Sequence, residues 1–119
     1  MEISELAKSF HEAKTDLSVQ EKDLVLIEKL VEDLLKDTQT PDLKLEISGL
    51  NRQIKSQNES IEVRKTEVDG LQEELLHEIQ SGKYDAEQKI EVALNESSYF
   101  EVWKTKKDTL GYSAPLNRN

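Results

Sequence analysis

The chain from residue 47 to residue 75 carries an aliphatic side chain at every seventh position. These positions are Ile47, Ile54, Ile61, Val68 and Leu75. A second row lies three residues further on, where Leu50 and Leu71 are apolar whereas Gln57 and Arg64 are polar. Residues spaced by seven return to nearly the same face of an α-helix, so the pattern predicts a helix with one narrow apolar stripe. Such a helix is stable in water only when another helix covers the stripe.

An earlier heptad pattern predicts a first helix from about Ile3 to Lys36. Its two rows are Ile3, Phe10, Leu17, Leu24 and Val31, and, three residues later, Leu6, Ala13, Gln20, Ile27 and Leu34. Pro41 then interrupts the pattern, because proline lacks an amide hydrogen and is tolerated only in the first turn of a helix. A second helix is therefore expected from about Pro41 to Ser81, with Thr40 as its N-cap.

The short loop near residues 37–41 favours an antiparallel coiled-coil hairpin over residues 1–81. A parallel dimer of extended helices is the alternative, and the proline weighs against it. The residues expected in the seam are Leu17, Leu24, Ile27, Val31, Ile47, Leu50, Ile54, Ile61, Val68, Leu71 and Leu75.

Two glutamines fall at matching heights in such a hairpin. Gln20 lies 19 residues before Gln39, and Gln57 lies 18 residues after it. We expect them to fix the register by a hydrogen bond across the seam, although two half-exposed glutamines would give the same pattern. Arg64 falls near the height of Asp16 and can pair with it.

Beyond Gly82, the pattern predicts a short C-terminal helical segment over residues 82–111. Asp85 with Gln88, and Ser98 with Glu101, have the spacing of capping boxes. Residues 112–119 contain a proline and no periodicity, so a flexible tail is expected there. The predicted fold class is thus all-α: a long antiparallel coiled-coil hairpin with a short C-terminal helical segment.

Composition supports long helices and narrows the chemistry. Charged residues make up 34% of the chain and aromatic residues 5%, which leaves little for a large core and favours a homodimer or small homo-oligomer. There is no cysteine, and His11 and His77 do not converge in a hairpin, so we expect solvated histidines, no metal and no cofactor. No catalytic set can be assembled, so no enzyme activity is expected.

The negative charge lies in the first two thirds of the chain. Residues 1–81 hold 19 Asp/Glu against 10 Lys/Arg, whereas residues 82–119 hold 6 of each. An acidic body opposes nucleic-acid binding, which needs cations to replace counterions, but it can imitate a nucleic acid. No secretory signal or membrane-spanning run is present, so a cytoplasmic protein without membrane contact is expected.

The most unusual composition lies between residues 99 and 107. Three of the six aromatic side chains occur there beside lysines: Tyr99, Phe100, Trp103, Lys104 and Lys107. These residues are a hypothetical partner-binding patch, since tryptophan and tyrosine often anchor interfaces. The favoured alternative is that Phe100 and Trp103 pack the segment onto the hairpin. Binding of single-stranded nucleic acid is a third reading.

Three functions fit these features. The first is a non-catalytic adaptor or scaffolding protein that binds a protein partner through its coiled-coil helices and aromatic patch. The second is an acidic inhibitor that occupies the basic groove of a nucleic-acid-binding enzyme, such as a phage-encoded anti-defence protein. The third is an assembly chaperone, which differs from the first mainly in its partner.

Overall fold

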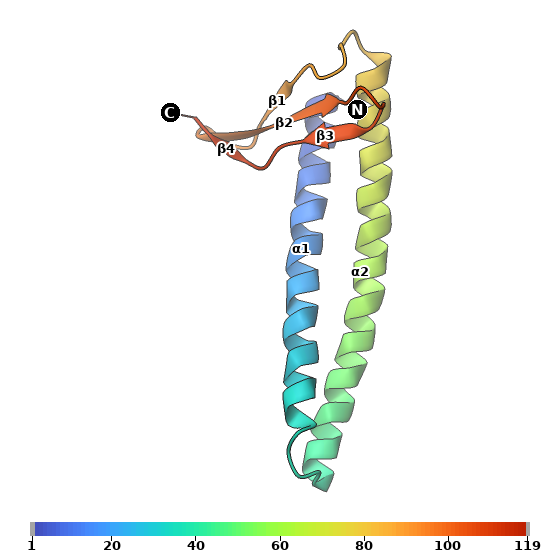
Figure 1. Cartoon of the computed structure of the whole chain (residues 1–119), viewed down its shortest axis with the longest axis vertical. Helices are drawn as coiled ribbons and strands as arrows, with labels where there is room; N and C mark the ends of the chain where they lie inside the picture. The colour runs from blue at the N-terminus through green and yellow to red at the C-terminus, as the bar shows by residue number, and fades with distance from the viewer. Residues whose placement is uncertain (1, 119) are drawn as a thin grey trace. The chain divides into compact units, whose positions relative to one another are not determined.

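Two long helices precede a small antiparallel sheet in the computed structural model, which describes residues 2–118 (Figure 1). Met1 and Asn119, the outermost positions of the predicted hairpin and tail, lie outside the described residues. The elements are α1 (Ile3–Leu34), α2 (Pro41–Ser81), β1 (Ile90–Ala93), β2 (Ser98–Lys104), β3 (Leu110–Tyr112) and β4 (Leu116–Asn117).

The two helices begin and end close to the positions that the heptads predict. The Leu43 amide donates to Thr40 Oγ1 at 3.2 Å, which confirms Thr40 as the N-cap of α2. Gly82 follows the last residue of α2, as predicted, but its φ is not positive. A Cβ at Gly82 would lie 2.8 Å from the ring of Tyr84. The glycine is therefore required for the close approach of this ring and not for a left-handed cap.

The all-α prediction is wrong for the C-terminal segment, which forms a four-stranded antiparallel sheet and no helix within the described residues. β2 is the central strand, with β1 on one edge and both β3 and β4 on the other. Val92 lies opposite Phe100 on the β1–β2 ladder, and Trp103 lies opposite Gly111 on the β2–β3 ladder. The segment predicted as a flexible tail contains β4, which pairs with the start of β2.

Alternation with a period of two explains why this segment is a sheet. Phe100 and Val102 are buried, whereas Tyr99, Glu101 and Trp103 point to the opposite face of β2. The β-branched and aromatic side chains of this segment also favour a pleated strand over a helix.

The predicted helix caps form turns instead. Asp85 N donates to Gln88 Oε1 at 2.9 Å, as in a capping box, but Gln88 N donates to Asp85 O at 3.1 Å and closes a tight turn. Glu87 adopts a φ of 68° in this turn. In the β2–β3 loop, Asp108 has a φ of 57°, which fits a three-residue hairpin loop whose last residue is left-handed.

The described chain divides into two compact units. Unit 1 comprises Met1–Ala13 and Glu67–Asn119, and unit 2 comprises Lys14–Thr66. Unit 1 contains eleven of the fourteen buried apolar residues found in residues 2–118: Leu6, Ala7, Phe10, Ala13, Val68, Leu75, Ile79, Val92, Phe100, Val102 and Leu110. Its core thus combines the start of α1, the end of α2 and the inner face of the sheet.

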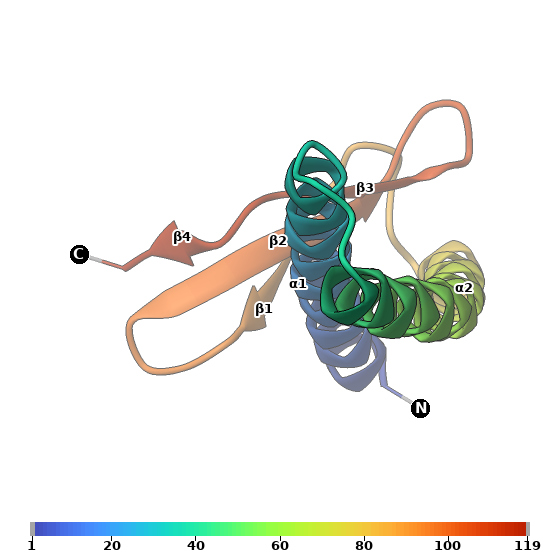
Figure 2. The same ribbon diagram turned by 90° about the horizontal axis from the view of Figure 1, so that it is seen from below.

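Aromatic contacts show how the sheet packs on α1 within unit 1. The ring of His11 stacks on Phe100 with centroids 5.0 Å apart, and Phe10 meets Tyr112 edge to face at 5.2 Å. Figures 1 and 2 show the strands beside the first turns of α1. His11 is half-buried, so the prediction of a solvated side chain is wrong for this histidine.

Unit 2 is an antiparallel pair of helical segments joined by a loop at residues 35–40. Its fully buried apolar residues are Val31, Ile47 and Ile61. The glycine in its α2 segment, Gly49, has open space around it, because a Cβ there would meet nothing within 4 Å. The glycine therefore does not serve a close approach of the two helices.

Candidate interaction surfaces

The residues of the predicted partner-binding patch do not share one surface. Phe100 is 1% exposed in the core of unit 1, while Tyr99 and Trp103 are half-buried on the opposite side of the sheet. Lys104 ends β2 in a half-buried position, and Lys107 is exposed in the following loop. The favoured packing role therefore applies to Phe100 but not to Trp103.

We call the side of the sheet that points away from the core of unit 1 the outer sheet face. Its side chains alternate with the buried ones on the strands and are Glu91, Tyr99, Glu101, Trp103 and Leu116. This face joins aromatic, aliphatic and acidic side chains on a hydrogen-bonded frame. Such a mixture is typical of surfaces that bind other proteins.

Trp103 lies flat on the outer sheet face because its cross-strand neighbour is a glycine. A Cβ on Gly111 would overlap the indole, so only glycine leaves room for the ring in this position. The other face of the indole carries the ammonium of Lys89, whose Nζ lies 3.2 Å from the ring centroid. This cation–π contact is solvent-exposed and contributes about 0.5–1 kcal/mol.

Tyr99 has a similar cationic neighbour at the other end of β2. The guanidinium of Arg118 lies 4.7 Å from the centre of the phenol ring and also pairs with the carboxylate of Glu91. The side chains of Arg118 and Glu91 are 42% and 50% exposed. Pairs exposed to this degree contribute only about 0–1 kcal/mol, so they can exchange partners readily.

Two carboxylates lie directly opposite each other between the rings. Glu91 and Glu101 are cross-strand partners, an arrangement that destabilises a sheet because like charges repel. Arg118 compensates Glu91, whereas no Lys, Arg or His side chain of residues 2–118 lies within salt-bridge distance of Glu101. The centre of the outer sheet face therefore holds an uncompensated negative charge.

The sequence analysis missed this surface because it assigned the segment to a helix. On a helix, Tyr99 and Trp103 would lie on one face with Phe100 about 100° away. On a strand, Phe100 points to the core. The signal that could have revealed the strand is the alternation of Phe100 and Val102 with Glu101 and Trp103.

A second exposed surface lies on α1 in unit 2. Val19, Leu26 and Leu30 are 53%, 65% and 46% exposed. Their spacing of seven and four residues puts them on one side of the helix, outside the seam. We call these three residues the α1 aliphatic row. The exposure of Leu35 and Leu45, at the loop end of the helices, adds to the apolar surface of unit 2.

None of the eleven predicted seam residues is exposed: each one is buried or half-buried in its unit. In unit 2, Arg64 lies 3.9 Å from Asp16, which confirms the expected pairing. Gln57 Nε2 donates to the backbone carbonyl of Gln20 at 3.4 Å. Gln20 Oε1 is the one buried side-chain oxygen or nitrogen in residues 2–118 without a hydrogen-bond partner.

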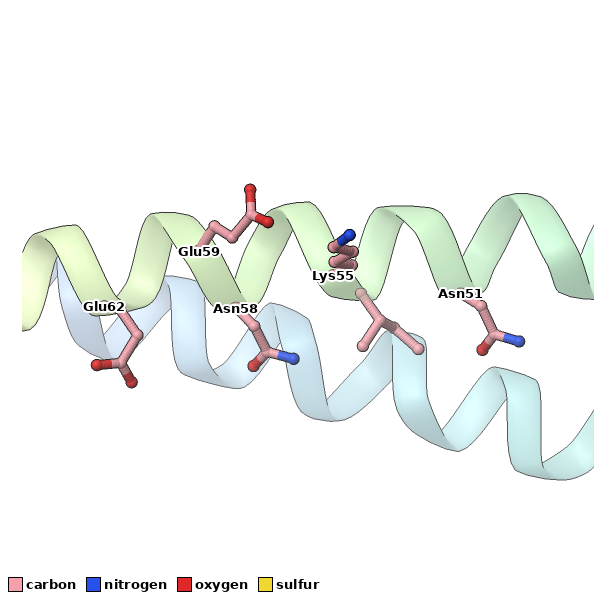
Figure 3. A pocket seen from close by; sticks show the side chains of 6 residues that line it. Asn51, Lys55, Asn58, Glu59 and Glu62 are labelled. Carbon is pink, nitrogen blue, oxygen red and sulfur yellow. The ribbon is translucent and has the colours of Figure 1, made fainter.

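Shallow hollows occur on the helices of unit 2 and are lined by polar side chains. One lies on α2 around Ile54 and is lined by Asn51, Lys55, Asn58, Glu59 and Glu62 (Figure 3). These side chains come from successive turns of one helix and do not enclose a space. A second hollow on α1, around Val25 and Leu26, is similarly open.

The charge of the chain is concentrated in unit 1. Unit 1 contains 14 Asp/Glu against 7 Lys/Arg, whereas unit 2 contains 11 against 9. Residues 67–81 hold five of these carboxylates and no lysine or arginine. The acidic surface expected along both helical arms is therefore weak in unit 2 and strong near the end of α2.

Residues 2–118 contain no group of three or more His, Asp or Glu side chains placed to hold a metal ion. In the same residues, neither helix has a stretch apolar enough to cross a lipid bilayer. Comparison of the chain with protein-family models, with curated proteins and with solved structures found no match.

Proposed function

We propose that this chain is a non-catalytic protein–protein interaction protein, an adaptor or scaffold, that binds through unit 2. The observation that supports the proposal is the α1 aliphatic row. Three large aliphatic side chains project into solvent on one side of a helix whose seam is already covered by α2. Burial of one such side chain contributes roughly 1.5–3 kcal/mol, so a partner that covers all three is strongly favoured.

A second copy of the chain is the simplest partner for this row. In a two-fold symmetric dimer the same row from each protomer forms the contact, which buries six aliphatic side chains instead of three. The pattern of the row, with steps of seven and four residues, suits helix-to-helix packing. The charge of unit 2 is nearly balanced, so repulsion between two copies of this unit is weak.

The oligomeric state tests this proposal. Sedimentation velocity over a range of protein concentrations should show a dimer for the native chain. Leu26→Glu with Leu30→Glu should shift it to monomer, because two carboxylates would be buried without partners. The matched control is Ser48→Glu with Gln53→Glu, which adds the same charge at exposed positions of α2 and should leave the dimer intact. A native chain that stays monomeric, or a dimer that survives the leucine changes, would contradict the proposal.

The acidic inhibitor is a second candidate, and the charge of unit 1 favours it. Carboxylates near the end of α2 could enter the basic groove of a nucleic-acid-binding enzyme in place of phosphates. Such a complex should weaken steeply as salt concentration rises, since its attraction is between exposed charges. A complex held by aliphatic or aromatic side chains should persist. An assembly chaperone would behave like the adaptor and differ in the identity of its partner.

A further inference from the structure

We infer that the outer sheet face binds an extended, basic segment of a protein partner, with Arg or Lys side chains at alternate positions. A partner of this kind is one case of the protein–protein interaction proposed above and so rests on that proposed function. It uses unit 1, however, whereas the dimer contact uses unit 2, so the two can fail separately.

The two rings of the outer sheet face already carry cations. Lys89 covers Trp103, and Arg118 lies over Tyr99. These contacts show which chemistry the rings accept, because an aromatic face attracts a cation through its negative quadrupole. Both resident side chains are more than 40% exposed, so a partner's cations can displace them at little cost.

Glu101 supplies the third point of recognition. It lies between Tyr99 and Trp103 on the same face of β2, two residues from each, and no cation of residues 2–118 pairs with its carboxylate. Its cross-strand neighbour is another glutamate, Glu91. An arriving arginine would relieve this like-charge contact and form a charge-assisted hydrogen bond with the half-buried carboxylate.

The spacing of these three points fits an extended segment. Alternate residues of a strand are about 7 Å apart. A segment that lies along β2 would thus place one basic side chain over Tyr99, the next at Glu101 and the third over Trp103. The intervening side chains of the segment would point to solvent, and Leu116 would give the segment an apolar contact beside Tyr99.

Charge selects a basic protein segment over a nucleic acid. A single-stranded nucleic acid could stack its bases on the two rings, but its phosphates would meet Glu91 and Glu101. Unit 1 as a whole holds twice as many Asp/Glu as Lys/Arg. The same charges that repel phosphates attract a basic segment and increase its association rate.

Trp103, the sole tryptophan of the chain, allows a direct test. The full-length protein is titrated with a synthetic peptide in which arginine alternates with threonine, and with a peptide of the same length in which glutamate replaces arginine. The arginine peptide should change the Trp103 fluorescence saturably, whereas the glutamate peptide and single-stranded oligothymidine should not. Binding of oligothymidine, or equal binding of the two peptides, would overturn the inference.

Two pairs of variants assign the binding to this face. Glu101→Gln should weaken peptide binding about tenfold, since it removes a charged hydrogen-bond acceptor. Its control, Glu96→Gln, removes one charge in the β1–β2 loop and should leave the affinity nearly unchanged. Lys89→Ala should tighten binding about two- to fivefold because it uncovers the indole. Lys83→Ala, which removes the same charge elsewhere in unit 1, should not tighten it equally.

The outcomes separate this inference from the proposed function. If Glu101→Gln binds the arginine peptide as well as the native chain does, the outer sheet face is not the binding site, whatever the oligomeric state. If the peptide binds as expected but the leucine changes leave sedimentation unaltered, the α1 aliphatic row is not an interface and only the proposal for unit 2 fails. Circular dichroism of each variant ensures that lost binding is not lost folding.

Discussion

Glycines inside α2 provide the simplest test at the scale of single residues. A Cβ at Gly49 or Gly70 would meet no atom within 4 Å. Alanine at either position should therefore raise the free energy of unfolding by about 0.5–1 kcal/mol, because it restricts the unfolded chain and favours the helix. Urea denaturation measures this change.

Gly111→Ala is the opposite case and serves as the contrast. Its new methyl group would overlap the indole of Trp103, so the ring or the strand must move and stability should fall. A gain in stability at Gly111, or a loss at Gly49 and Gly70, would show that the packing described around these glycines is wrong.

Gln20 makes a second residue-scale prediction. Its Oε1 is buried in unit 2 without a hydrogen-bond partner, and an unsatisfied oxygen of this kind costs about 1–3 kcal/mol. Gln20→Leu should thus stabilise the protein, whereas Gln53→Leu, at an exposed position of α2, should change stability by less. Thermal unfolding of the two variants gives the comparison.

The same glutamine tests the register of the helical pair. Replacing both Gln20 and Gln57 by leucine should stabilise the seam yet allow it to slip, because the polar contact between them is lost. Cysteines introduced at Asp16 and Arg64, which pair in the native register, should then form a disulfide less completely. Undiminished cross-linking would exclude a register role for the two glutamines.

At the scale of secondary-structure elements, the helices could be predicted and the strands could not. Heptads and a proline define α1 and α2, since both signals are local in sequence. The strands are short, and their turns use the same residues as helix caps: the amide of Asp85 does bond to Gln88, but in a tight turn. Only the sheet partners, up to twelve or more residues away, decide between the two structures.

The N-cap of α2 provides a test at this scale. Thr40→Ala removes the acceptor for the Leu43 amide and should lower the free energy of unfolding by about 0.5–2 kcal/mol. Thr38→Ala changes a threonine of the same loop that lies outside the cap, so it should have a smaller effect. Similar losses for both variants would indicate that the loop, and not the cap, matters for stability.

At the scale of the whole molecule, the buried apolar residues are unevenly shared. Of those in the described chain, eleven belong to unit 1 and three to unit 2. Backbone amides of β2 and of residues 68–79 should accordingly exchange with solvent more slowly than those of residues 43–66. Hydrogen exchange followed by mass spectrometry measures this difference. Uniform protection along α2 would mean that the two units open together.

The heptads could not predict this distribution, because they describe only what a helix shares with its nearest partner. The core of unit 1 depends on Phe100 and Val102, whose role in a sheet was not recognised. The outer sheet face was missed for the same reason. Its residues were noticed for their composition, but their arrangement depends on the strand order.

The pairing of distant segments in unit 1 has a consequence during synthesis. His11 contacts Phe100, and Phe10 contacts Tyr112, so about 90 to 100 residues separate the partners. At the usual ribosomal rate, roughly 5–20 s pass between the emergence of the two sides of this core. The apolar face of the first turns of α1 stays uncovered during that interval, when a ribosome-associated chaperone would have its main opportunity to bind the nascent chain.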